Sequence, residues 1–379
     1  MKKKILLSTA DLGSIENLKA EPTLMIYKGL YKVDSSSQLY VRDYKNFNTY
    51  SVKKTLLFGR ALPFCFEFIN KYLRKNSKFN ISYIKIIDYL FSLKVNKNIE
   101  LLYVIPPLFP NTTRKVFNNS GVTIMHAGVN HPSFNEDKKR ADNSNKPLLD
   151  TIKYSKYIFA LSTLTKETYV KSGFNKNNIY IVPLGVNHKK YKPSTKKDNV
   201  FRVICVADYT ISKGFQDMLK VWEKVKLENS ELIIIGNPKD SYMKKTIQEY
   251  SKKLTNLKTY SHQDPLSFYQ QSSVLIHPSY SDSWGKVVTE AMACELPVIA
   301  SQNTGAKDAI TQGKDGFIIK PGSLQEIEEK LLYLYNNSKQ RKDMGKMARQ
   351  KVIQEHTWER ATQKAEKAFK DILKKEQKL

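Results

Sequence analysis

The sequence predicts an α/β protein of two domains, each built around a mainly parallel sheet. The chain has 379 residues, which is enough for two ordinary domains with their own cores. Short apolar runs rich in β-branched residues alternate with amphipathic helical patterns. The segment PLGVNHKKYKPSTKKDN (183–199) has two prolines, many lysines and no apolar period, as expected of a linker. We therefore expect domains at residues 1–185 and 186–359.

The predicted strands are continuous apolar runs, which are typical of parallel sheets covered by helices on both faces. They lie at residues 4–9, 122–127, 157–162, 179–183, 202–207, 232–236, 274–279, 297–301 and 316–320. Helical patterns lie near residues 213–226, 241–254, 286–294 and 323–335. The alternation is clean from residue 200 onward and blurred before residue 120. Because open parallel sheets bind ligands at the carboxyl ends of their strands, we expect a ligand cleft between the domains.

The composition is that of a globular protein, with 41% hydrophobic residues and no apolar run near the ~20 residues of a membrane span. The start MKKKILLSTADLG has an apolar core of ILL, which is too short for an export signal, so we expect a first strand there. Cys65, Cys205 and Cys294 are far apart and lack metal-ligand spacing. We therefore expect neither a disulfide framework nor a zinc site, and a cytoplasmic location.

The formal net charge of +27 predicts attraction to an anionic partner, such as a phosphate-bearing ligand, a membrane surface or nucleic acid. A solvated lysine-rich surface is the plain alternative. The segment PFCFEFINKYLRKNSKF (63–79) has helically spaced aromatic residues among lysines and arginine, which suits docking on anionic lipid. The pattern is more often that of a helix packed on a sheet with a solvated face. No nucleic-acid-binding module accompanies the charge, so no nucleic-acid partner is expected.

The stretch HPSYSDSWGKVVTEAMACELPVIAS (277–301) holds two acids around a predicted helix start. Asp282 lies in a polar turn after a strand, and Glu290 lies on the second turn of the helix. We expect Glu290 to accept hydrogen bonds from ribose hydroxyls and Asp282 from sugar hydroxyls. Taken singly, each has a structural alternative, since Asp282 suits a turn and Glu290 an exposed helix position.

Between these acids, Gly285 removes a side chain where the chain enters the helix. The amides of Lys286, Val287 and Val288 then form an anion site at the positive end of the helix dipole. A diphosphate there, with an acid on each side, would accommodate a sugar nucleotide.

A second candidate anion site lies in TISKGFQDML (210–219), after a predicted strand. Lys213 stands at the expected helix start, where the helix dipole disfavours a cation by a few tenths of a kcal/mol unless an anion binds. Gly214 follows it, and Ser212 is placed to cap the helix. A surface lysine in a strand-to-helix turn is the alternative. G-x-G-x-x-G and G-x-x-x-x-G-K-[ST] do not occur, so neither pattern supports a nucleotide site here.

These motifs together resemble the retaining GT-B glycosyltransferases, specifically the group 1 (family 4) set. The family pattern PS-x-x-E-x-(F/W)-G-x-x-x-x-E-A-x-A-x-G-x-P-V matches residues 278–298 nearly throughout. The SKG turn, VPLGVNHKKYKP, TGAKDAITQGKDGFII and MARQKVIQEHTWERATQKAEKAF are also similar to family motifs. The similarity covers about residues 155–370.

The resemblance implies two Rossmann-like domains facing across a cleft, with a C-terminal helix near 360–379 crossing back to the acceptor-side first domain. It implies transfer of a sugar from a nucleoside-diphosphate sugar, with retention, to a glycan or lipid-linked acceptor. It implies no metal and no cofactor besides the donor substrate, which Lys213, Gly214, Gly285, Lys286, Val287 and Glu290 would bind. Asp282 would face the sugar, and the departing diphosphate would be stabilised electrostatically.

The family often places a histidine near the donor sugar and acceptor, in the region of IMHAGVNHP (124–132). His126 is the candidate, and His131 is the alternative. The resemblance therefore gives a catalytic set of Asp282, Glu290, Lys213 and His126, in cell-surface polysaccharide or glycolipid synthesis. A peripheral position on the inner face of the membrane is a further expectation.

The sequence departs from the family at four positions. Asp282 replaces a glutamate, Glu295 replaces the usual glycine before L-P-V, and Asp208 stands near the place of an arginine that contacts phosphate. The N-terminal loop has Gly13 where the family has a pair of glycines. An epimerase of the same fold, acting on nucleotide sugars without an acceptor, is the main alternative function, followed by a basic nucleic-acid-binding protein.

Overall fold

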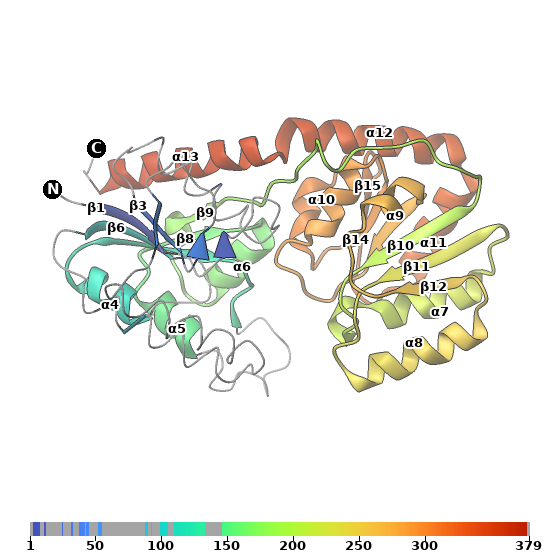
Figure 1. The fold of residues 1–379 in the computed structure, drawn as a ribbon, viewed down its shortest axis with the longest axis horizontal. Coiled ribbons are helices and arrows are strands. Elements are labelled where there is room, and N and C mark those ends of the chain that lie inside the picture. The colour runs from blue at the N-terminus through green and yellow to red at the C-terminus, as the bar shows by residue number, and fades with distance from the viewer. Residues whose placement is uncertain are drawn as a thin grey trace. The chain divides into compact units, whose positions relative to one another are not determined.

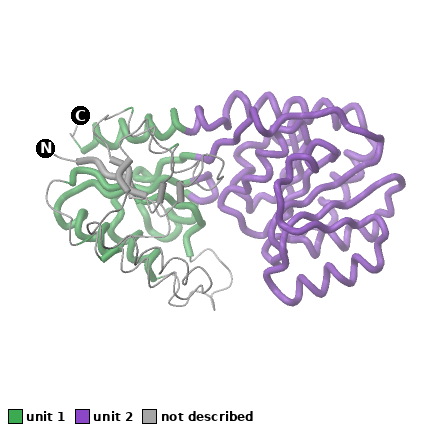
Figure 2. The backbone as a smooth tube through the Cα atoms, in the orientation of Figure 1, with its two compact units in different colours: residues 1–160, 166–182, 362–379 green, residues 161–165, 183–361 purple. Residues whose placement is uncertain are grey.

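The computed structural model describes strands at 3–7, 11–12, 38–41, 43–44 and 52–54, residues 25, 32, 88, 89 and 92, and the ranges 99–104, 110–132 and 146–376. Cys65, Gly13 and the basic segment 63–79 lie outside the described residues. The chain divides into two compact units, shown in Figure 2. The first contains residues 1–160, 166–182 and 362–379, and the second contains residues 161–165 and 183–361.

The first unit holds a parallel sheet of seven strands in the order β5-β3-β1-β6-β7-β8-β9. Its strands are β1 (Lys3–Leu7), β3 (Gln38–Val41), β5 (Val52–Lys54), β6 (Ile99–Val104), β7 (Val122–Ala127), β8 (Tyr157–Ala160) and β9 (Ile179–Ile181). A separate pair is formed by β2 (Asp11–Leu12) and β4 (Asp43–Tyr44). The helices whose bounds the structure describes in this region are α4 (Pro110–Asn118), α5 (Lys146–Lys153) and α6 (Thr163–Lys171).

The end of the chain belongs to this first unit. Helix α13 (Trp358–Lys375) starts in the second unit, and residues 362–379 group with the first. Phe369 is fully buried, with its ring centroid 5.6 Å from that of Tyr103 and 5.0 Å from that of Phe159. These contacts confirm the expected return of the C-terminal helix to the first domain.

The second unit holds a six-stranded parallel sheet in the order β12-β11-β10-β13-β14-β15 (Figure 1). Its strands are β10 (Phe201–Val206), β11 (Ser230–Ile235), β12 (Leu257–Tyr260), β13 (Val274–His277), β14 (Val298–Ser301) and β15 (Gly316–Ile319). Its helices are α7 (Phe215–Val225), α8 (Ser241–Lys253), α9 (Leu266–Gln271), α10 (Lys286–Ala293), α11 (Leu324–Asn336) and α12 (Ser338–Glu355). Every strand and helix predicted beyond residue 200 is present, with ends within two residues of the prediction. Strand β12 and helices α9 and α12 were not predicted from the sequence.

Both faces of this second sheet are buried, as the continuous apolar strands predict. Along β10, Val203 and Cys205 join a core cluster that includes residues of α7, α8 and α11. Ile204 and Val206 point the other way, into a cluster that includes residues of α10 and α12. Cys205 and Cys294 are both buried free thiols. None of the described helices is long and apolar enough to cross a membrane.

The position of β10 in the sheet sets the place of the candidate site. Strand β10 lies between β11, which follows it in the chain, and β13, which is the third strand after it. The order of the strands therefore reverses between β10 and β13. In open parallel sheets, ligands bind outside the carboxyl ends of the strands at this point. The loops after β10 and β13 are the two that carry the predicted anion sites.

Candidate functional site

The loops after β10 and β13 are joined by backbone and side-chain hydrogen bonds. The Ser212 carbonyl accepts from the Tyr280 amide at 2.8 Å and from the Ser279 hydroxyl at 3.0 Å. Residues about 67 positions apart in the chain therefore form one surface at the carboxyl ends of the strands. This arrangement brings the two predicted anion sites together.

Lys213, Asp282 and His277 form a compact charged cluster on these loops. Oδ2 of Asp282 lies 2.7 Å from Nζ of Lys213 and 3.2 Å from Nε2 of His277. Its other oxygen, Oδ1, accepts from the Trp284 amide at 3.2 Å. Burial by itself would raise the pKa of Asp282, but the hydrogen bonds and charges of His277 and Lys213 outweigh it and hold that pKa well below its usual range. Asp282 is therefore ionised at neutral pH.

Two glycines start the helices that follow these loops. Gly214 and Gly285 have φ of 71° and 78°, a left-handed conformation that disfavours other residues, and they precede α7 and α10. A Cβ on Gly214 would lie 2.2 Å from the Pro278 carbonyl oxygen, and one on Gly285 would lie 2.7 Å from Cγ2 of Thr304. Both glycines therefore allow close approach of backbone segments as well as an unusual φ.

The cap residues of α7 and α10 are these two glycines, which have no side chain to cap the helix start. The expected cap by Ser212 is wrong, because its hydroxyl pairs with that of Thr210 at 3.0 Å. Of the three amides expected to be available at the start of α10, that of Val288 is not, because it donates to the Gly285 carbonyl at 2.9 Å. Two helix N-termini whose cap residues are glycines suit the binding of an anion.

Glu290 is buried in α10, with 5% of its surface exposed, so its alternative as an exposed helix residue is wrong. Burial raises its pKa to about 7, against the opposing charge of Lys286, whose Nζ lies 3.6 Å from Oε1. Lys190 and Asp264, which form an ion pair of 2.9 Å, also act on this carboxyl group. A buried carboxyl group with a perturbed pKa is a common mark of a functional position.

The two candidate histidines belong to the first unit. His126 is buried in β7, where Nδ1 lies 2.8 Å from the Tyr103 hydroxyl. Burial lowers its pKa to about 4, so its imidazole is neutral at pH 7. His131 is also buried, its ring lies edge-on to Tyr169 at 5.2 Å, and burial lowers its pKa.

His277, which ends β13, was not among the site residues predicted from the sequence. Its place at the carboxyl end of a buried strand, five residues before Asp282, was the available signal. Asp208, near the position of the family's arginine, instead accepts from the Asn237 amide at 3.2 Å and pairs with Lys239 at 3.5 Å. Glu295, at the family's usual glycine, has a left-handed φ of 64°, a conformation that favours glycine.

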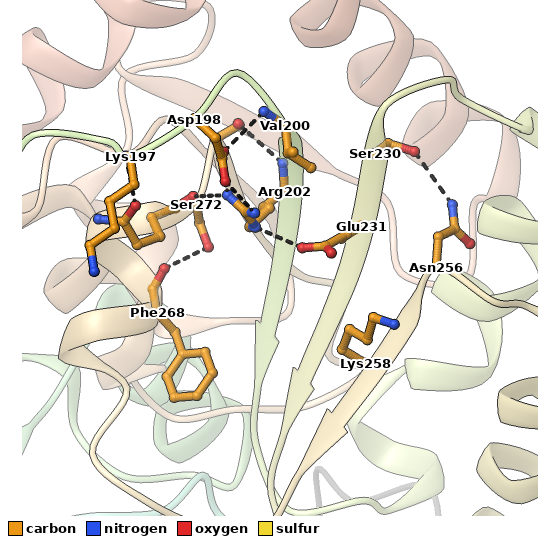
Figure 3. A network of polar contacts seen from close by, with 12 residues as sticks. Lys197, Asp198, Val200, Arg202, Ser230, Glu231, Asn256, Lys258, Phe268 and Ser272 are labelled. Atoms are coloured by element: carbon orange, nitrogen blue, oxygen red, sulfur yellow. Dashed lines mark hydrogen bonds and ion pairs between the residues drawn. The ribbon is translucent and has the colours of Figure 1, made fainter.

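A different polar network lies at the amino end of β10 (Figure 3). Arg202 binds both carboxylate oxygens of Asp198, at 2.7 and 2.8 Å, and Oε2 of Glu231 at 2.7 Å. These contacts fix the linker before β10 to the start of the sheet. Since the candidate site is at the carboxyl end of the strands, we assign this network a structural role.

Comparison with solved structures gives the class of the fold. HepE of Anabaena in complex with UDP matches with a TM-score of 0.68 at 15% identity, covering 98% of this chain and 100% of the other. Sucrose-phosphate synthase of Thermosynechococcus elongatus matches with a TM-score of 0.70 at 14% identity, covering 99% and 100%. WaaG, a glycosyltransferase of lipopolysaccharide biosynthesis, matches with a TM-score of 0.66 at 14% identity, covering 96% of this chain and 99% of the other. The chain thus has the GT-B fold of two Rossmann-like domains.

Sequence comparison gives the family. Residues 187–351 match the family model described as glycosyl transferases group 1. The capsular polysaccharide biosynthesis glycosyltransferase CapM of Staphylococcus aureus is 26% identical over 234 residues, which cover 58% of this chain and 60% of CapM. Trehalose synthase of Thermococcus litoralis is 27% identical over 227 residues, covering 53% of each chain. The chain spans little more than half the length of these relatives. The similarity to the glycosyl transferases group 1 family therefore lies in residues 187–351.

Proposed function

We propose that this protein is a glycosyltransferase that transfers a sugar from a nucleoside-diphosphate sugar to an acceptor with retention of configuration. One observation carries the proposal. Lys213 and the starts of α7 and α10 follow neighbouring strands at the point where the strand order reverses, and α10 also holds the buried carboxyl group of Glu290. A cation, two helix N-termini and an acid are what a nucleoside diphosphate requires.

Each group has a defined part in the proposed reaction. Lys213, Gly214 and the backbone at Gly285, Lys286 and Val287 bind the diphosphate and stabilise the charge that develops as it leaves the sugar. Glu290 accepts hydrogen bonds from the ribose. Asp282, beside the lysine, accepts hydrogen bonds from the sugar.

On the acceptor side, His126 remains our candidate. The imidazole is neutral at pH 7, and Nε2 is the ring nitrogen that does not contact Tyr103. According to its tautomer, Nε2 can donate a hydrogen bond to a sugar hydroxyl or accept one from it. His131 remains the alternative.

The relatives support a glycan or lipid-linked acceptor. CapM is named for capsular polysaccharide biosynthesis, and WaaB and WaaG for lipopolysaccharide synthesis. The net charge of +27 supports work at an anionic membrane surface, where a lipid-linked acceptor would be found. We therefore propose a role in cell-surface polysaccharide or glycolipid synthesis.

The test is a calorimetric and thermal-shift panel of UDP, GDP, ADP and CMP with the wild type, Lys213→Ala and Glu290→Gln. A nucleotide at 100 times its Kd should stabilise the wild type by ~2.7 kcal/mol. UDP comes first because the HepE structure contains it. We expect one nucleoside diphosphate to bind. Each of the two substitutions should weaken its binding at least about tenfold, or ~1.4 kcal/mol.

Matched controls separate the site from general effects of charge. Lys220→Ala removes an exposed lysine from α7, and Glu329→Gln removes an exposed acid from α11, so neither should change nucleotide binding. Wild-type affinity in both Lys213→Ala and Glu290→Gln would refute the site. Turnover of a nucleotide sugar to its epimer without an acceptor would favour the epimerase alternative. Salt-dependent binding of nucleic acid, unaffected by nucleotide sugars, would favour the alternative of a basic nucleic-acid-binding protein.

A further inference from the structure

One carboxylate oxygen in the candidate site has two partners. Oδ2 of Asp282 accepts from Nζ of Lys213 at 2.7 Å and faces Nε2 of His277 at 3.2 Å. The three side chains differ in exposure: 26% of Lys213 is exposed, 19% of Asp282 and 4% of His277. The lysine is therefore the member nearest solvent, and the histidine is the member held inside.

The lysine is also the member that is free to move. The Asp282 backbone is fixed on both sides, since its amide donates to the Asn303 carbonyl at 3.0 Å and its carbonyl accepts from the Gly305 amide at 2.9 Å. A short aspartate side chain on a fixed backbone has little reach. A lysine has a flexible stem of four carbons and can turn to another anion without moving the loop.

Turning Lys213 to a diphosphate would take a cation from a largely buried carboxylate. Removing one partner of such a pair is costly when the remaining charge is left uncompensated. His277 lies against the same oxygen and remains there when the lysine leaves. Its ring is held in place at the end of β13, and a Cβ on Gly285 would lie 3.3 Å from its Nε2.

We propose that Asp282 and His277 form a charge-exchange device for donor binding. In the donor-free protein Asp282 holds Lys213, and His277 is a positioning residue that keeps Asp282 partnered when Lys213 turns to the diphosphate. The identity of the incoming anion rests on the proposed function. The ion pair itself does not depend on it.

The device predicts effects of opposite sign on diphosphate affinity. Asp282→Asn removes the charge that competes for Lys213, so UDP should bind about three- to tenfold more tightly although sugar transfer falls. His277→Leu leaves Lys213 as the main partner of Asp282, so UDP should bind about three- to tenfold more weakly. His277→Gln, which keeps an N–H donor in the same region, should bind nearly as the wild type does.

Calorimetric titration of UDP into these variants measures the effects, and the double variant tests the coupling. Asp282→Asn/His277→Leu should bind as tightly as Asp282→Asn, because His277 has no carboxylate to partner once Asp282 is neutral. Weaker binding by Asp282→Asn would overturn the proposal, as would equal losses in His277→Gln and His277→Leu. If His277→Leu does not fold, the sign of the Asp282→Asn effect decides.

A second measurement needs no donor. Acylation of Lys213 in the free protein, followed by mass spectrometry with Lys220 as internal reference, reports how firmly the amine is held. It should be faster in Asp282→Asn and slower in His277→Leu than in the wild type. That pattern without binding of any nucleoside diphosphate would refute the proposed function and leave the device standing. An unchanged rate in both variants would overturn the device even if UDP binds.

Discussion

At the scale of single residues, Glu290 links function to stability. It is a buried carboxyl group whose pKa is raised to about 7 from an ordinary value of 4.5. A raised folded-state pKa means that the folded protein binds the proton more tightly than the unfolded chain does. The stabilising contribution is fully present below pH 4.5 and is lost as the pH rises through 7. Ionised Glu290 therefore lowers stability at neutral and alkaline pH.

We expect Glu290→Gln to remove this dependence. The difference in free energy of unfolding between the variant and the wild type should grow in favour of the variant between about pH 5 and pH 8, on the order of 3 kcal/mol. Urea denaturation of both proteins across this range measures it. The comparison cancels all other titrating groups, so parallel stability curves would contradict the burial of an ionisable Glu290.

At the scale of elements, the packing of the loop after β10 on the loop after β13 depends on Gly214. Its left-handed φ and the approach of the Pro278 carbonyl, 2.2 Å from a would-be Cβ, both exclude a side chain. Gly313 has a similar φ of 75° with nothing within 4 Å of its would-be Cβ. Substituting Gly214 and Gly313 in turn therefore separates the free-energy cost of the left-handed backbone from the cost of a steric clash with the neighbouring loop.

We expect Gly313→Ala to lower the free energy of unfolding by about 1 kcal/mol, from backbone strain alone. Gly214→Ala should lower it by at least about 2 kcal/mol more and should also weaken nucleotide binding, because Lys213 is its neighbour. Thermal and chemical denaturation with UDP titration measures both effects. Equal destabilisation by the two substitutions would show that the loops can separate at no cost.

At the scale of the whole molecule, the N-terminal and C-terminal segments of the chain both belong to the first unit. Phe369 near the C-terminus is fully buried against Tyr103 and Phe159 of the first unit. Further contacts join Tyr157 to Glu376 at 2.7 Å and Tyr180 to Asp371. The first unit is therefore incomplete without the last helix, although most of the second unit lies between the two in the sequence.

We expect Phe369→Ala to destabilise the first unit by about 3–5 kcal/mol, from lost burial and the cavity left behind. Hydrogen exchange followed by mass spectrometry should show faster exchange in β6 and β8 with little change in β10 and β13. Lys367→Ala, an exposed substitution on the same helix, is the control. Equal loss of protection in both units would indicate that they unfold together.

The sequence predicted the second unit in detail and the first in part. Beyond residue 200, each strand except β12 is a continuous apolar run bounded by turn residues, so local patterns determine it. Strand β12, with the sequence LKTY, has no such run and was missed. The pairing of Asp282 with Glu290 on either side of a helix start was also visible locally. In the first unit, β6 was missed, although its IELLYV is as apolar as the strands that were predicted. The pattern before it is blurred, and no clear alternation marked its place.

The sequence by itself determined most elements of the second unit and the residue types of its site, because helix and strand periods and turn chemistry act over a few neighbouring residues. The tertiary structure alone decided which groups meet. Lys213 and Asp282 are 69 positions apart, and they pair because β10 and β13 are neighbours in the sheet. His277 joins them through the direction of a buried side chain at a strand end. Strand order and side-chain direction depend on packing across the whole unit, which no local pattern specifies.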